Sequence, residues 1–316
     1  MTKVRSSDSS MIDDRRGQSG GGGGGGLGGL FPGAGGGGGF PGGGGGGGGF
    51  PFPMKAGGGM LGIIMVLAAM FLPKLLGAGT QGAAAVPQSN ARSVEGSTTG
   101  ELTTDLEQIV AGATVDVQTY WQEALPKYFG TDYLVTKTVL FTGGTNTGCG
   151  NATSETGPFY CPLDSLVYID LDFMQQLETQ LVGKTSDLAE QYIVAHEYGH
   201  HIQNVLGTNE QVRQAQQNDP GRANQYSVAL ELQADCYAGV WVGDVNARGL
   251  LDSSAEINEA LDAAAGVGDD RIQQKTQGRI DKEAWTHGSA EQRQSWFTRG
   301  FNTRDPRQCD TFNEVL

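Results

Sequence analysis

The stretch VAHEYGHH, residues 194–201, lies within a long run whose apolar residues recur at helical spacing without a proline. His196 and His200 are four residues apart, so on a helix they lie on one face, one turn apart. Two neutral imidazoles at this spacing can bind one Zn²⁺ and leave positions for a third protein ligand and a water. The stretch therefore predicts a metal-binding helix over residues 187–206.

Glu197 follows the first of these two histidines and is expected to point toward the same open side of the helix. There its carboxylate can take a proton from a metal-bound water as general base, which is the HExxH pattern of zinc peptidases. A coincidental match is the alternative. The chain contains only 4 His, which makes such a match improbable.

The composition of the 316 residues limits the possible partners and the compartment. The net charge is −14, and the acidic excess lies after residue 75, so the chain would repel the phosphates of a nucleic acid. The four cysteines all follow residue 140, and none forms a CxxC pair. We therefore expect no nucleic-acid partner, and disulfides rather than a thiolate metal site.

Four segments are expected along the chain. Residues 1–55 form a Gly-rich arm that cannot bury enough surface to offset its chain entropy, so disorder is predicted. A spacer role is the simpler interpretation, with self-association through the regularly placed Phe-Pro pairs as the alternative. Residues 56–78 are predicted to be a transmembrane anchor, 79–100 a linker of small residues, and 101–316 the folded domain.

The anchor prediction depends on residues 56–73, which carry no charge and are bracketed by Lys55 and Lys74. Their length just suffices to cross a bilayer, and the apolar residues 75–78 extend it. A signal peptide cleaved near the alanines at 83–85 is the competing interpretation. The denser basic residues before the span predict a single-pass protein in the cell membrane, with a cytoplasmic N-terminus and an extracytoplasmic domain. Disulfides suit such an oxidising compartment.

The domain is expected to be α+β, mainly helical with a small sheet. A helix opened by a capping Thr should run from about 102 to 123, before Pro126, and a strand should cover 133–141. Residues 143–154 look like a loop, followed by extended pieces at 157–162 and 167–170. Further helices are predicted over 172–182, 187–206, 209–217, 222–247, 254–264, 266–276 and 289–300.

A catalytic zinc needs a third protein ligand, and Glu231 is the best candidate. Glu231 and Asp235 are four residues apart on a second predicted helix, among apolar neighbours that make two solvated acids improbable. Asp235 could then accept the other ring N–H of a ligand histidine and fix its orientation. Asp187, Glu190 and Glu210 are weaker alternatives for the ligand.

Three stretches together resemble the putative neutral zinc metallopeptidase family of bacteria: HEYGHH (196–201), ELQADC (231–236) and GPFYCP (157–162). Residues 11–17, MIDDRRG, are similar to the family's N-terminal opening, whereas the long Gly-Phe-Pro arm departs from it. The family resembles the gluzincins, which use two His and one Glu. The resemblance implies a membrane-anchored, zincin-like metallopeptidase domain with His196, His200 and Glu231 on zinc, acting on a peptide or protein substrate that it does not identify.

His287 follows a Thr at a place where gluzincin relatives carry a Thr-His element near the site. By that resemblance, it is a catalytic candidate that could hydrogen-bond the oxyanion of a tetrahedral intermediate. Tyr198, Tyr237 and Arg293 are alternatives for the same part. His201 lies about 100° around the helix from His200, so it is expected in the core or behind a ligand.

The four cysteines can pair in three ways. Cys149 and Cys161 flank a polar segment with no core of its own, which favours a local bridge. A bridge from Cys236 to Cys309 would tie the C-terminal tail to the helix that presents Glu231. The alternative is that Cys236 is a small core residue and Cys309 a free thiol.

Three functions are compatible with these patterns. The first is a zinc peptidase in which Glu197 activates the zinc-bound water. The second is an envelope binding or scaffold protein that keeps the fold without turnover, and the third is a structural metal domain closed by a fourth ligand. The intact Glu197 favours the peptidase, and no cysteine or further histidine has a spacing that favours the structural site.

Overall fold

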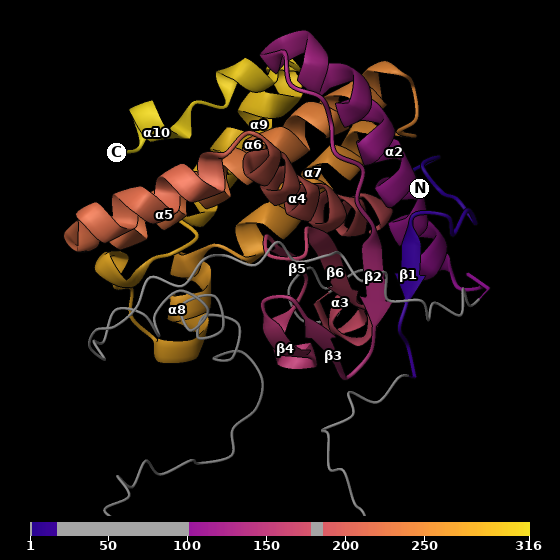
Figure 1. Cartoon of the computed structure of the whole chain (residues 1–316), viewed down its shortest axis with the longest axis horizontal. Coiled ribbons are helices and arrows are strands. Elements are labelled where there is room, and N and C mark those ends of the chain that lie inside the picture. Colours follow the sequence, from indigo (N-terminus) through magenta and orange to yellow (C-terminus); the bar gives the residue numbers. More distant parts are fainter. Residues whose placement is uncertain (1, 18–100, 178–185) are drawn as a thin grey trace, which may run out of the picture.

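The computed structural model describes residues 2–17, 101–177 and 186–316, and it confirms a mainly helical α+β fold with a small sheet (Figure 1). The helices are α2 (Asp105–Phe129), α3 (Leu171–Leu177), α4 (Asp187–Val205), α5 (Thr208–Asn218), α6 (Ala223–Ala247), α7 (Ser254–Gly266), α8 (Asp269–Gln277), α9 (Ala290–Thr303) and α10 (Thr311–Glu314). The strands are β1 (Ile12–Asp14), β2 (Thr138–Phe141), β3 (Gly144–Thr147), β4 (Gly150–Thr153), β5 (Phe159–Cys161) and β6 (Leu166–Asp170).

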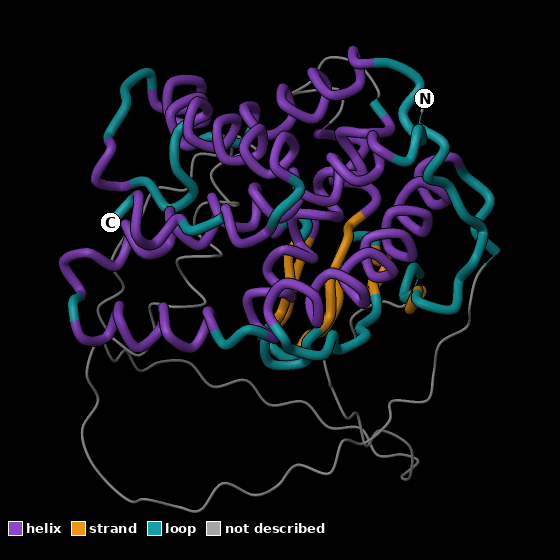
Figure 2. Tube along the Cα trace, turned by 90° about the horizontal axis from the view of Figure 1, so that it is seen from above, coloured by secondary structure: helices purple, strands orange, loops and turns teal. Residues whose placement is uncertain are grey.

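The main sheet has four strands in the order β1-β2-β6-β5. β2 pairs in parallel with both β1 and β6, whereas β5 is antiparallel to β6 and forms an edge. β3 and β4 make a separate antiparallel hairpin. The sheet lies on one side of a layer of helices that contains α2, α4, α6, α7 and α9 (Figures 1 and 2).

The centre of the helical layer is the crossing of α4 and α6. At Gly199 of α4 an added Cβ would lie 2.9 Å from the Cα of Ala234 on α6, so only glycine permits this approach. Large side chains such as Trp121, Trp241 and Phe297 are buried in the same hydrophobic core. The close crossing brings the two predicted ligand segments together.

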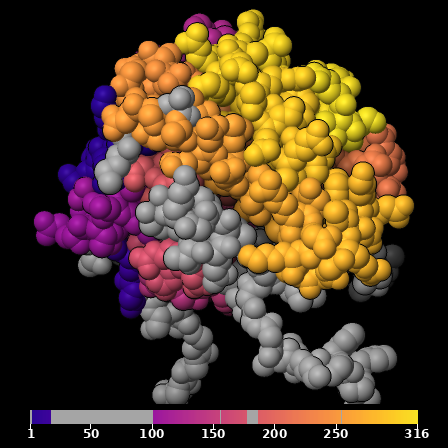
Figure 3. All heavy atoms as spheres, turned by 180° about the vertical axis from the view of Figure 1, so that it is seen from behind, coloured from indigo at the N-terminus to yellow at the C-terminus, as the bar shows by residue number. Residues whose placement is uncertain are grey.

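The N-terminal segment, residues 2–17, belongs to the folded domain. β1 forms the edge of the main sheet next to β2, and Val4 and Ile12 are buried. Gly112 of α2 meets this segment so closely that an added Cβ would lie 2.6 Å from the Cα of Arg5. Figure 3 shows the segment (indigo) against the residues that follow position 100 (purple).

The predicted disorder of residues 1–55 is therefore wrong for residues 2–17. Their short polar sequence finds its partners far along the chain: Arg16 pairs with Glu107 of α2, and Gln191 of α4 donates to the backbone carbonyl of Val4 at 2.6 Å. No local pattern within the segment signals such distant pairing. Residues 18–55 of the expected arm lie outside the described residues.

Other expected boundaries shift for local reasons. The first helix does not end before Pro126 but continues to Phe129. It is capped there by Gly130, which has a left-handed backbone conformation and whose N–H donates to the Pro126 carbonyl. The strand expected at 133–141 is shorter, since β2 begins only at Thr138, and the expected loop at 143–154 holds the β3–β4 hairpin. α3 is described from Leu171 to Leu177, and residues 178–182 of its expected length lie outside the described residues.

The expected anchor at 56–78 and linker at 79–100 also lie outside the described residues. Within 2–17, 101–177 and 186–316, no helix has both the length and the apolar content needed to cross a membrane.

Two disulfides join the four cysteines, in the pairs expected from the sequence. Cys149 bonds Cys161, which fixes the turn of the β3–β4 hairpin to β5, and Cys236 bonds Cys309, which fixes the C-terminal tail (residues 305–316) to α6. The tail is further held by Thr311, whose hydroxyl donates to the Ala229 carbonyl of α6 at 2.6 Å. The tail therefore packs against the helix that carries Glu231.

Candidate metal centre

Three side chains from α4 and α6 converge on one point. The Nε2 atom of His196 lies 3.2 Å from one carboxylate oxygen of Glu231, and the Nε2 atom of His200 lies 3.5 Å from the other. One potential ligand atom from each residue lies within 4.8 Å of the others. The two histidines occupy one helical face, and the close approach of α6 at Gly199 brings Glu231 opposite them.

This arrangement fits a zinc ion in its donor chemistry and spacing. Two nitrogens and one carboxylate are a usual set of three ligands for catalytic zinc. Ligand atoms about 2.0–2.1 Å from a tetrahedral ion lie roughly 3.3 Å from each other. The two distances from Glu231 to the histidine nitrogens bracket that value. Among the described residues, these three groups could act as ligands, which would leave a fourth position for water or substrate.

The electrostatics of the three groups also favour a cation. Burial by itself would lower the pKa of His196, but the Asp235 and Glu231 carboxylates raise it to about 10. Burial likewise opposes protonation of His200, whose pKa is nevertheless raised by Glu231. Burial would raise the pKa of Glu231, yet the facing histidines lower it well below its ordinary value. Positive charge is thus stabilised at the point where the ligands meet.

The second ring nitrogen of His196 is held by an ionic group. Its Nδ1 lies 2.8 Å from Asp235, whose carboxylate also receives Nε and Nη2 of Arg293 at 2.7 and 2.9 Å and the hydroxyl of Tyr192. Asp235 and Arg293 are almost fully buried. Burial raises the pKa of Asp235, but Arg293 and His196 outweigh it and lower the value to about 2. The carboxylate is therefore ionised and fixes the ring of His196.

The second ring nitrogen of His200 is held by neutral groups. Its Nδ1 lies 2.8 Å from the side-chain oxygen of Gln203, one turn further along α4. The Gln203 amide donates in turn to the Leu230 carbonyl at 2.7 Å and to Gln233 at 3.2 Å. His196 and His200 thus present Nε2 to the same point from different supports.

Glu197 is buried beside the ligands, with 7% of its surface exposed. Burial raises its pKa, the charges of His196 and His200 oppose that rise, and the charge of Glu231 adds to it. A carboxylate with a raised pKa is suited to taking a proton and returning it. This is the position that the HExxH pattern predicts for the base.

His287 lies in the segment between α8 and α9, beside the helix that carries Glu231: at the adjacent Gly288 an added Cβ would lie 3.2 Å from Val228 and 3.3 Å from Leu232 of α6. Asp269, at the start of α8, fixes this loop. One of its oxygens accepts the backbone N–H groups of Thr286, His287 and Gly288 at 2.6–3.1 Å, and the other lies 3.1 Å from Nδ1 of His287. The histidine is buried to 9% exposure. Its ring is oriented by a carboxylate, as a group that binds a developing charge must be.

The alternatives to His287 are engaged elsewhere. The Tyr198 hydroxyl bonds Thr138 of β2 at 3.0 Å, and Tyr237 packs edge-on against Trp121 of α2. Arg293 is committed to Asp235. His201, as expected, points away from the ligands.

The whole chain also matches a known family. The family described as "Putative neutral zinc metallopeptidase" matches residues 1–312. The chain belongs to the putative neutral zinc metallopeptidase family. The uncharacterized protein YpfJ of Escherichia coli is 41% identical over 268 residues, 84% of this chain and 90% of that relative. The uncharacterized proteins Mb2605 of Mycobacterium bovis and Rv2575 of Mycobacterium tuberculosis are each 49% identical over 214 residues, 65% of this chain and 69% of each relative.

No solved structure matches the chain. The matched range of this zinc metallopeptidase family includes the N-terminal segment, in agreement with its place in the sheet.

Several residues around the centre of this family member were not identified from the sequence. Asp269 has no motif of its own, and the sequence indicates Arg293 only as an oxyanion group. Tyr192 and Gln203 carry a usable signal, because they lie four residues before His196 and three residues after His200 on the same helix, and Gln233 lies within the ELQADC stretch. Asp269 and Arg293 come from separate elements and reach the site only in the folded chain.

Proposed function

We propose that this protein is a zinc-dependent peptidase that hydrolyses peptide bonds in peptide or protein substrates. The observation that carries the proposal is the convergence of both Nε2 atoms on the Glu231 carboxylate, with the buried Glu197 beside them. Membership of a zinc metallopeptidase family supports it. In this proposal His196, His200 and Glu231 hold the ion.

The bound ion would polarise the scissile carbonyl and lower the pKa of the attacking water. Glu197 takes a proton from that water and passes it to the leaving amine. His287, fixed through Nδ1 by Asp269, stabilises the negative oxygen that develops on the carbonyl. Asp235 and Arg293 keep the ring of His196 in place throughout.

The test is metal content together with turnover. The purified protein should contain about one zinc per chain on the stoichiometry of a three-ligand site, and it should cleave unstructured protein or a peptide library. Chelation should abolish cleavage and added zinc should restore it. Full cleavage by protein stripped of metal would refute the proposal.

The second candidate is a binding or scaffold protein with this fold and no turnover. Retention of the buried Glu197 argues against it, because burying a carboxylate is costly and serves no purpose without proton transfer. A chain that binds zinc and a peptide but never cleaves the peptide would support this candidate.

We further propose that the domain is extracytoplasmic, since its four cysteines form two disulfides, which persist in oxidising compartments. Membrane attachment through residues 56–78 stays a proposal that rests on their sequence alone. Any such attachment has to keep the N-terminal segment and the domain on one side, because β1 pairs with β2. A helix at 56–78 that crossed the bilayer once would put these two parts on opposite sides, so the pairing is incompatible with the predicted single-pass span as well as with the cytoplasmic N-terminus that the basic residues favour.

The orientation can be tested with single cysteines at exposed positions. A membrane-impermeant thiol reagent should label both Ser7→Cys and Glu123→Cys in intact cells, because both residues are exposed in the same fold and the native cysteines are oxidised. Labelling of Glu123→Cys alone, with Ser7→Cys reacting only after permeabilisation, would place the N-terminus on the other side.

A further inference from the structure

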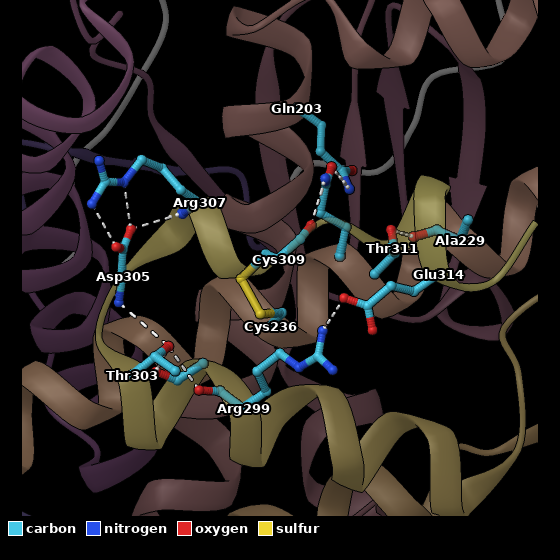
Figure 4. Close-up of a disulfide and its surroundings, with 12 residues drawn as sticks. Gln203, Ala229, Cys236, Arg299, Thr303, Asp305, Arg307, Cys309, Thr311 and Glu314 are labelled. Carbon is cyan, nitrogen blue, oxygen red and sulfur yellow. Dashed lines mark hydrogen bonds and ion pairs between the residues drawn. A yellow bond between two sulfur atoms is a disulfide. The ribbon is translucent and has the colours of Figure 1, made fainter.

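A row of amide hydrogen bonds runs from His200 to the C-terminal tail. The Nδ1–H of His200 donates to Gln203 at 2.8 Å, the Gln203 amide donates to Gln233 at 3.2 Å, and the Gln233 amide donates to the Cys309 carbonyl at 2.9 Å. We call these bonds the amide relay. Figure 4 shows Gln203 above Cys309, with the Cys236–Cys309 disulfide directly below.

The hydrogen bonds of the relay all run in one direction, from donors on the His200 side to acceptors on the Cys309 side. Each amide accepts through its oxygen and donates through its nitrogen, and the row ends on a backbone carbonyl that can only accept. With Gln203 fixed in this orientation, His200 must carry its proton on Nδ1. Its Nε2 lone pair is then available at the point where His196 and Glu231 also converge.

The relay also sets His200 relative to Glu231. The Gln203 amide bonds the carbonyl of Leu230, the residue before Glu231, at 2.7 Å. Gln203 is fully buried and Gln233 is 8% exposed, so water does not readily replace either partner. One side chain therefore links the two helices that present ligands.

The far end of the relay depends on the tail. The Cys309 carbonyl is held over α6 by the disulfide to Cys236, the residue that follows Asp235. The hydroxyl of Thr311 bonds the Ala229 carbonyl on the same helix, and both Cys309 and Thr311 are buried. Separation of the tail would leave the Gln233 amide without its acceptor.

We propose that Gln203 and Gln233 are positioning residues for the metal ligand His200, and that the Cys236–Cys309 disulfide acts on the metal site through them. This inference rests on the proposed zinc site. It predicts that zinc affinity, and not stability alone, depends on the relay and on the attachment of the tail. Zinc affinity is measured by competition with a chromophoric chelator and needs no turnover.

The first test compares three Gln→Met variants of the full chain, which preserve size and remove the amide. Gln203→Met should weaken zinc binding roughly 10-fold, the lower end for loss of an outer partner of a ligand, and Gln233→Met should weaken it about 3–5-fold. Gln191→Met is the matched control. Gln191 is also a fully buried glutamine of α4, but it bonds the N-terminal segment, so its loss should leave zinc affinity unchanged.

Gln203→Glu separates the two functions of Gln203, because it keeps an oxygen acceptor for His200 but its carboxylate cannot donate to the Leu230 carbonyl or to Gln233. It should regain part of the affinity that Gln203→Met loses, and the protected Nδ1–H proton of His200 should be visible by NMR in the parent and in Gln203→Glu but not in Gln203→Met. Equal affinity in the parent, Gln203→Met and Gln233→Met would overturn the relay. Failure of the parent to bind zinc would instead refute the proposed function.

The second test is a double-mutant cycle between the tail and the relay. Cys236→Ala with Cys309→Ala should weaken zinc binding about as much as Gln233→Met, and the two changes combined should cost no more than either alone. The matched control is Cys149→Ala with Cys161→Ala, which removes a disulfide that takes no part in the relay and should leave the affinity unchanged. Additive losses, or an equal loss in the control, would refute the route through Gln233.

Discussion

His196 and His200 lie one turn apart on α4 and face the same carboxylate, but the regions behind them differ in kind. Behind His196 lies an ion pair, in which Asp235 joins Arg293 of α9 at 2.7 Å and both side chains are buried. Behind His200 lie the neutral amides of Gln203 and Gln233, ending on the backbone of the tail. One ligand is supported by charge and the other by a row of neutral hydrogen bonds.

Because of this difference, we expect mutations in the two supports to have different energetic costs. Removing one member of a buried ion pair leaves an unpaired charge, which typically costs about 3–5 kcal/mol. Removing a neutral hydrogen bond costs about 1 kcal/mol, plus the desolvation of any partner left unsatisfied. The His196 side should therefore govern the stability of the domain, and the His200 side the finer geometry of the centre.

The largest effect is expected where neither support is changed. Glu197→Gln keeps all three ligands and both supports but removes the base, so zinc content should be retained while kcat/KM falls roughly 10²–10⁴-fold. Zinc content and peptide cleavage should be measured on the same preparation. Cleavage at the parent rate would show that Glu197 is not the base, and loss of zinc would show that it also holds the ion.

The next largest effect is expected from a mutation that removes the ion pair behind His196. Arg293→Leu should destabilise the domain by about 3–5 kcal/mol, because Asp235 remains as a buried carboxylate without its partner. Denaturant unfolding of the full chain measures the change.

Arg299→Leu on the same helix is the control for Arg293→Leu. The ion pair of Arg299 with Glu314 is exposed at both ends, so it should contribute about 0–1 kcal/mol. If both variants lost a similar amount of unfolding free energy, the buried ion pair behind His196 would contribute no more to stability than an exposed one.

A smaller effect is expected on zinc affinity, which compares the two supports directly. Asp235→Asn keeps the shape of the side chain but removes its charge, and should weaken zinc binding about 10–100-fold. Gln203→Met should weaken it less, because a neutral acceptor polarises the imidazole less than a carboxylate does. Chelator competition on both variants gives the order, and a larger loss for Gln203→Met would reverse the comparison.

The smallest effect is expected in the N-terminal segment, remote from both supports. Burial opposes ionisation of Glu107, but two backbone N–H groups and Arg16, itself paired with Asp14, lower its pKa below the ordinary value. A lowered pKa in the folded state contributes stability above about pH 4.3, the unfolded value, and that contribution is lost as pH falls below it.

Hydrogen exchange of residues 2–17 should therefore accelerate in acid before the core does. Glu107→Gln should exchange faster at neutral pH and show little further change in acid, with zinc affinity unaltered at neutral pH. An exchange rate in the parent that is independent of pH between 5 and 3, after correction for the intrinsic chemistry, would count against this contact.

The helices of the domain and the two histidines were predictable because their signals are local. The apolar spacing of residues 187–206 and 222–247 marks two buried helices, and α4 and α6 follow those limits closely. The spacing of His196 and His200 places both on one face whatever surrounds them. The capping box of Thr104 and Glu107 likewise determines the start of α2.

What the sequence could not indicate depends on partners distant in the chain. β1 is three residues long and exists only because β2, more than a hundred positions later, offers it an edge. The prediction of disorder for residues 1–55 is wrong for residues 2–17, because the composition of a segment carries no information about distant strands that can pair with it. The pairs Asp235–Arg293 and His287–Asp269 likewise join separate elements.

The sequence by itself determined the chemistry: two histidines and a glutamate on one helix, a second glutamate on another, and four cysteines in an order that allows two bridges. Only the tertiary structure decided the geometry. The crossing of α4 and α6 at Gly199 sets Glu231 opposite the histidines, and the folding of α9 and the tail onto α6 gives each histidine its support. The physical reason is that residue types and helical periodicity act over a few positions, whereas orienting a ligand requires hydrogen bonds from groups that only the folded core brings within about 3 Å.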